Sequence, residues 1–135
     1  MDPRRWRALI LVSVAMLLSL SAWMTATSVS SELQAQWGLS SSQVAFLTTT
    51  VQLGFVVGTA IAAVLNLADL VPSRILFGGS AALAAAANAV LLLAPSYHSA
   101  LLARFLTGAF LAGVYPPGMK MVSTWFRSAR GLAIG

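Results

Sequence analysis

Four long apolar runs divide the chain, and short polar segments separate them. Each run holds roughly 20 residues, which as an α-helix rising about 1.5 Å per residue crosses about 30 Å of hydrocarbon. The runs lack the strict alternation of apolar and polar residues that is typical of membrane β-strands. Because backbone polar groups must find partners within lipid, we predict an all-α membrane protein with four transmembrane helices. These helices are predicted at residues 8–29, 44–65, 75–94 and 100–122.

Local signals mark the ends of several runs. Ser40 followed by Gln43 predicts a capping box at the start of the second helix, and Pro95 ends the third helix. Residues 131–135 have the pattern of the first turn of a fifth helix, and so few residues cannot cross a bilayer. We therefore expect residues 1–135 to be a partial transmembrane domain, the front part of a longer chain.

The composition agrees with a bilayer as the solvent. Hydrophobic residues make up 59% of the chain and charged residues only 8%, whereas soluble domains are about 25% charged. The absence of cysteine excludes disulfides and thiolate metal sites. One histidine and three acids offer little for hydrolytic or metal chemistry, and no nucleotide-binding or hydrolase motif is present. We predict no enzyme activity, no cofactor and no metal site.

The net charge of +5 has a simple distribution. If the helices alternate in direction, the loops on one side carry seven basic residues and the opposite loops carry no Lys or Arg. These residues are Arg4, Arg5, Arg7, Arg74, Lys120, Arg127 and Arg130. The positive-inside rule predicts a multi-pass protein of the inner (cytoplasmic) membrane with a cytoplasmic N-terminus. Since orientation in the lipid bilayer accounts for the charge, we expect no nucleic-acid partner.

Arg104 is the most unusual residue within the runs, about five residues and roughly 8 Å into the fourth helix. Intramembrane charges usually face a bundle interior or a water-filled cavity. The alternative is that Arg104 snorkels to the outer headgroups. No carboxylate lies within the four runs. Its partner must be a hydroxyl, an amide, a carbonyl, a residue on further helices or an anionic ligand. We predict an interior site for substrate binding or coupling, and the missing acid favours an anionic substrate.

Small and amide-bearing residues indicate how the spans pack. Gly54, Gly58 and Ala62 recur every four residues on the second helix, a pattern typical of close helix packing. Gln52 and Asn88 lie within spans, where amides usually form hydrogen bonds between helices.

The fourth run contains residues that disturb a helix. Gly108 and Gly113 are followed by Pro116 and Pro117. Proline removes a backbone donor and kinks a helix, which membrane helices tolerate when neighbours satisfy the freed carbonyls. The pattern predicts a bend, which either is static or lets the helix rock.

Asp69 and Arg74 lie five residues apart on the predicted turn between the second and third helices. They are interpreted either as an exposed pair that only sets topology, or as a charge clamp whose contacts change when helices rearrange.

Four segments resemble a known family. The turn "LNLADLVPSR" is similar to the motif G-x-L-A-D-R-x-G-R-R, and "LLARFLTG" to the fourth-helix pattern L-x-x-R-x-x-x-G. The Gly-Pro segment through Pro117 and the end "WFRSARGLAIG" complete a likeness to the N-terminal part of a major facilitator superfamily transporter. In the turn, matches stand at Leu67, Ala68, Asp69 and Arg74, and departures at Leu65, Leu70, Pro72 and Ser73. The likeness covers essentially the whole chain.

The resemblance implies a unit of two six-helix halves, of which this chain supplies one three-helix repeat and one further helix. It implies that Arg104 serves coupling or substrate binding, and that Asp69, Arg74 and Arg130 belong to a cytoplasmic gate. A narrower likeness is to bacterial anion porters such as nitrate or cyanate transporters.

The function expected from these features is secondary active transport of a small solute by alternating access. The partners would be the bilayer, a small-molecule substrate, which the missing acid suggests is anionic, and transporter helices absent from this chain. The alternative is a self-contained four-helix membrane protein that acts as an oligomeric small exporter or assembly factor.

Overall fold

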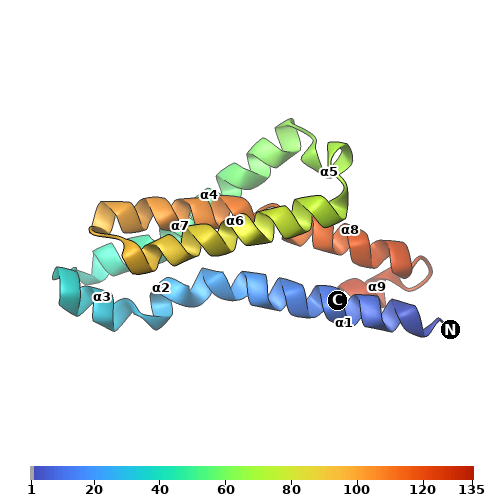
Figure 1. Ribbon diagram of the computed structural model, residues 1–135, viewed down its shortest axis with the longest axis horizontal. Helices are drawn as coiled ribbons and strands as arrows, with labels where there is room; N and C mark the ends of the chain where they lie inside the picture. The colour runs from blue at the N-terminus through green and yellow to red at the C-terminus, as the bar shows by residue number, and fades with distance from the viewer. Residues whose placement is uncertain (1) are drawn as a thin grey trace.

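The computed structural model describes residues 2–135, and these residues form helices without any β-strand (Figure 1). Their order is α1 (Pro3–Ser21), the 3-10 helix η1 (Ala22–Met24), α2 (Thr25–Ser28), α3 (Ser30–Trp37), α4 (Ser41–Val64), α5 (Leu67–Leu70), α6 (Ser73–Leu93), α7 (Tyr97–Leu111), α8 (Tyr115–Trp125) and α9 (Arg130–Ile134).

Within the described part of the chain, four helical stretches are long and apolar enough to cross a membrane. They are Pro3–Ser28, Ser41–Val64, Ser73–Leu93 and Tyr97–Trp125. The predicted all-α membrane class with four spans is therefore confirmed. The short helix α9 occupies the place where the start of a further helix was expected.

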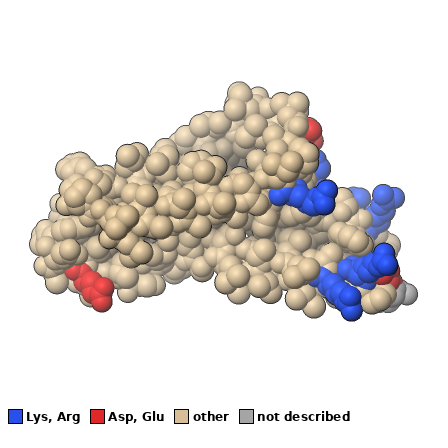
Figure 2. Space-filling model, viewed as in Figure 1, with Lys and Arg blue, Asp and Glu red and all other residues tan. Residues whose placement is uncertain are grey.

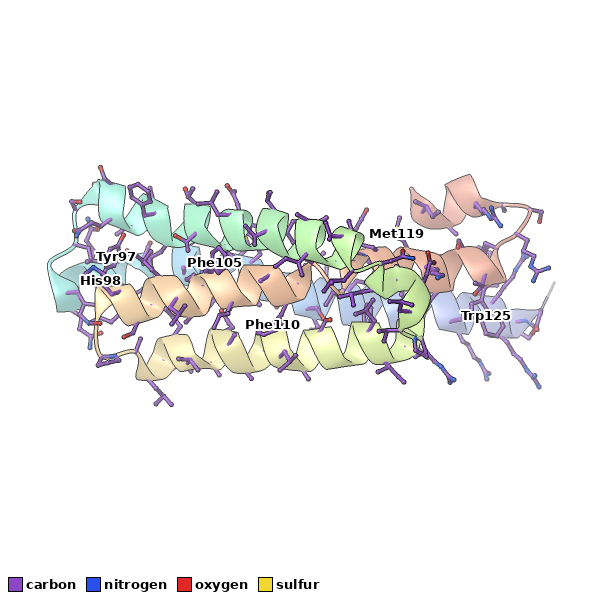
Figure 3. The ribbon with its side chains drawn as sticks, turned by 90° about the horizontal axis from the view of Figure 1, so that it is seen from above. Tyr97, His98, Phe105, Phe110, Met119 and Trp125 are labelled. Atoms are coloured by element: carbon purple, nitrogen blue, oxygen red, sulfur yellow. The ribbon has the colours of Figure 1, made fainter. Side chains whose placement is uncertain are left out.

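Helix α7 is central to the arrangement. It lies between α4 and α6 and contacts both, while α1 crosses on another side and meets α8 (Figure 3). Phe105 of α7 lies on the side of α4, and Phe110 lies on the side of α6 (Figure 3). The fourth span therefore touches the other three spans, and a side chain on α7 can reach all of them.

Glycines let α4 and α7 approach closely. A Cβ atom added to Gly54 would collide with the backbone of Phe105, and one added to Gly108 would collide with the backbone of Val51. Gly58 meets Ala109 in the same way. The predicted small-residue stripe thus lies against the fourth span. Gly108, which we expected in a bend, lies inside uninterrupted α7 and serves this contact instead.

Two of the four spans are interrupted. The first was predicted as one helix, but α1 ends at Ser21 and the chain passes through η1 into α2. The fourth is broken between Leu111 and Tyr115, and Pro116 lies in the first turn of α8. Proline is tolerated there because first-turn amides have no partner within the helix.

The connection between the first two spans is more ordered than expected. Residues 30–42 were predicted as a polar connection, yet they contain α3. Gly38 ends α3 with a φ of 61°, a left-handed conformation that glycine adopts without steric cost. The predicted capping box of Ser40 and Gln43 at the start of α4 is confirmed.

Charge separates along the long axis of the molecule. On the face shown in Figure 2, the basic side chains gather at one end, where acidic side chains also lie, and the other end carries an acidic side chain but no basic one. The basic end holds the N-terminus, the turn from α5 to α6, and the segment that links α8 to α9 (Figure 1).

Candidate functional site

Arg104 of α7 is completely buried, with 0% of its surface exposed. Its Nη1 group donates to the carbonyl of Ala22 at 2.8 Å and to Oδ1 of Asn88 at 3.1 Å. Its Nη2 group donates to the carbonyl of Trp23 at 2.6 Å, and its Nε group donates to the carbonyl of Leu47 at 3.4 Å. A side chain buried in this way does not reach the headgroups, so the snorkelling alternative is wrong.

Two of the four acceptors for Arg104 come from the break in the first span. In η1 the amide of Thr25 bonds to Ala22 with the i to i+3 spacing of a 3-10 helix. This local change departs from the regular α-helical ladder, and the carbonyls of Ala22 and Trp23 accept from Arg104. The carbonyl oxygen has two lone pairs, so Ala22 satisfies both donors.

Asn88 contacts Arg104 directly and links it to a further residue of the first span. Its Oδ1 accepts from Arg104, and its Nδ2 donates to the hydroxyl of Thr25 at 3.1 Å. Because Asn88 belongs to α6 and Thr25 to the first span, the amide joins two helices as the sequence predicted. Through Leu47 on α4 the network also includes the second span. One guanidinium therefore connects all four spans.

The acceptors around Arg104 are neutral. No ion pair to this guanidinium is formed within residues 2–135, and four of its five N–H groups already have protein acceptors. An anionic ligand was one of several partners that the sequence left open. In the structure, backbone carbonyls and one amide take those positions.

A second polar contact lies at the basic end. Lys120 of α8 donates to the carbonyl of Ala68 at 2.7 Å, and its Nζ lies 3.4 Å from Oδ1 of Asp69. The expected partner Arg74 forms no ion pair with Asp69, and Arg130 lies exposed on α9. The structure thus brings Asp69 to the fourth span rather than to its neighbour in the motif.

Lys120 was predicted on the basic side of the membrane but not in this contact. Lys120 and Asp69 are 51 residues apart in the chain, and such a separation does not predict that they contact each other. The turn at Asn66, with a φ of 52°, directs α5 toward α8. The one local signal of that turn is Asn66 itself, because asparagine adopts the left-handed conformation more often than most residues other than glycine.

The break in the fourth span borders a cavity. The interruption covers residues 112–114, and a Cβ atom at Gly113 would collide with Ser80 of α6. A cavity of about 220 Å³ lies beside it, and its lining includes Pro116, Pro117 and Ala62. The interruption thus includes Gly113 and directly precedes the helical turn that holds the prolines, while a bend at these residues stays a prediction.

Four apolar spans joined by a buried polar network define a multi-pass membrane protein. The profile of the Major Facilitator Superfamily matches residues 11–135, nearly the full length of the chain. The chain belongs to this superfamily of secondary transporters. Nothing among curated proteins or solved structures matches it.

Proposed function

We propose that the chain forms part of a secondary transporter that moves a small solute across the cytoplasmic membrane by alternating access. The proposal places the N-terminus in the cytoplasm, since the basic residues gather at that end. It also includes further helices that complete a central cavity with these four spans. The observation that carries it is the buried arginine network in a chain of the transporter superfamily.

In this proposal Arg104 acts in coupling by holding the four spans as one unit. Alternating access requires such units to rock without coming apart. Arg104 supports this because its hydrogen bonds reach acceptors on the other three spans. Its acceptors are dipoles without formal charge, so the site keeps a net charge of +1. That charge favours an anionic solute, as in the nitrate or cyanate porters.

The proposed gate combines Asp69 and Lys120, with Arg74 and Arg130 at the same basic end. Both partners of the ion pair are well exposed, with 69% and 47% of their side chains accessible. Exposed pairs contribute about 0–1 kcal/mol. A contact of that strength is suited to a gate, since helix movement can break it at little cost.

The interruption around Gly113 is proposed as the position where α8 moves relative to α7. The adjoining cavity of about 220 Å³ leaves space beside Pro116 and Pro117. Helix breaks at proline and glycine are common sites of bending. No observation specifically favours the alternative of a self-contained oligomeric exporter or assembly factor.

The test is solute uptake by the natural full-length protein in proteoliposomes, with a panel of small anions and matched neutral solutes. Uptake of at least one solute is expected, and Arg104→Lys should abolish most of it. Arg7→Lys, the same replacement at an exposed position, is the control. Absence of uptake across the panel would count against the transport proposal. Normal uptake by Arg104→Lys would contradict the coupling role of Arg104 but leave the transport proposal intact.

A further inference from the structure

We propose that a crevice at the basic end, between α1, α6 and α8, binds the phosphate group of an anionic phospholipid. The crevice has a volume of about 340 Å³. Arg74 at the start of α6 and Lys120 of α8 both line it. Two cations facing one cavity favour an anion, and the planar guanidinium of Arg74 matches the geometry of a phosphate.

Arg74 is available for such a ligand. It forms no ion pair and no side-chain hydrogen bond with any residue from 2 to 135. Lys120 donates to the carbonyl of Ala68 and to the carboxylate of Asp69, but 47% of its side chain stays exposed. Asp69 offsets one positive charge, so Arg74 and Lys120 together keep an excess of positive charge at the crevice.

The first turn of α6 adds to the phosphate site. Thr124 of α8 also lines the crevice, but its hydroxyl donates to the carbonyl of Met121 at 2.7 Å and has no proton left for a phosphate. The residue that precedes α6, Pro72, provides no side-chain hydrogen bond to the first turn. First-turn amides without a cap carry partial positive charge, which adds to the field of the two cations.

The remaining walls favour a lipid over a free anion. Val12 of α1, Met121 of α8 and Trp125 of α8 supply apolar surface. Figure 3 shows Trp125 at the end of α8, beside the basic end of α1. Tryptophan is enriched where hydrocarbon meets headgroups. A phospholipid can place its phosphate beside the two cations and an acyl chain along the apolar wall, so it fits both the charged and the apolar part of the crevice.

Native mass spectrometry of the intact protein tests this assignment, with phosphatidylglycerol and phosphatidylethanolamine supplied in equal amounts. The wild type should retain more phosphatidylglycerol. Arg74→Gln should weaken that retention by about 10-fold, the loss expected when one charge-assisted bond to phosphate is removed. Arg127→Gln is the matched control, because Arg127 is exposed in the segment after α8 and does not line the crevice.

A second variant keeps the test decisive if Arg74→Gln folds poorly. Val12→Trp fills the crevice from α1 and leaves every charge in place, so it should also reduce lipid retention. Unchanged retention in both variants would overturn the proposal, because general attraction to basic loops would then explain the binding. Displacement of the lipid by millimolar inorganic phosphate would assign the site to a free anion and overturn the lipid source.

Discussion

At the scale of single residues, Arg104 is the buried charge whose hydrogen bonds connect the helices inside the bundle. Moving a charged group out of water is costly unless its hydrogen-bonding groups find partners. Here the guanidinium has acceptors from η1, α4 and α6, and Asn88 is the one side chain among them. The stability of this site therefore depends on acceptors whose positions are fixed, as the hydrogen bond to Thr25 fixes Asn88.

Asn88→Leu tests that dependence. The change removes an acceptor from Arg104 and the donor to Thr25, so the free energy of unfolding should fall by about 1–3 kcal/mol. Gln52→Leu is the control, since Gln52 is an exposed amide within a span. Titration with a denaturing detergent measures both. Equal stability of the two variants would mean that the amide of Asn88 is dispensable.

At the scale of elements, α4 and α7 contact each other through backbone atoms at their glycines. Gly108→Ala places a methyl group against the carbonyl of Val51, and overpacking of this kind should destabilise the protein by about 2 kcal/mol. Gly78→Ala on α6 is the matched change, because its Cβ would meet open space. It should be neutral or stabilise by up to about 1 kcal/mol, as alanine favours helices. If both variants change the free energy of unfolding in the same direction, the close contact between Gly108 and Val51 is contradicted.

At the scale of the whole molecule, the separation of charge predicts orientation. Residues 1–135 contain no cysteine, so each single substitution introduces the one reactive thiol of this segment. Ser96→Cys, next to the start of α7, should react with an impermeant thiol reagent applied outside intact cells, and Ser128→Cys at the basic end should not. The reverse pattern would place the N-terminus outside and refute the proposed topology.

The basic end is also where separate segments meet. Arg5 of α1 stacks on Trp6 and on Phe126, with its guanidinium carbon 5.5 and 5.3 Å from the two ring centroids. The two rings meet edge to face at 5.5 Å. These contacts attach the start of the first span to the residue that follows α8. They explain why α1 stays beside α8 although much of its surface is exposed.

The spans could be predicted because the length of an apolar run follows directly from bilayer thickness. The burial of Arg104 followed from the cost of a charge in lipid. Its acceptors could not be found in this way, since Ala22–Met24 contains neither glycine nor proline to signal a 3-10 turn. Lys120 was missed as the partner of Asp69 because pairing across spans depends on how helices turn and pack, which local sequence does not encode.

The role of Arg104 in holding the four spans together is tested most directly by the stability of Arg104→Lys relative to Arg7→Lys. Lysine keeps the charge but lacks the fork that reaches several acceptors together. In detergent titrations, Arg104→Lys should lower the free energy of unfolding by about 2–5 kcal/mol, as expected when a buried charged network loses its bonds. Arg7→Lys should stay within about 0.5 kcal/mol of the wild type. If Arg104→Lys is as stable as Arg7→Lys, the guanidinium does not hold the four spans together.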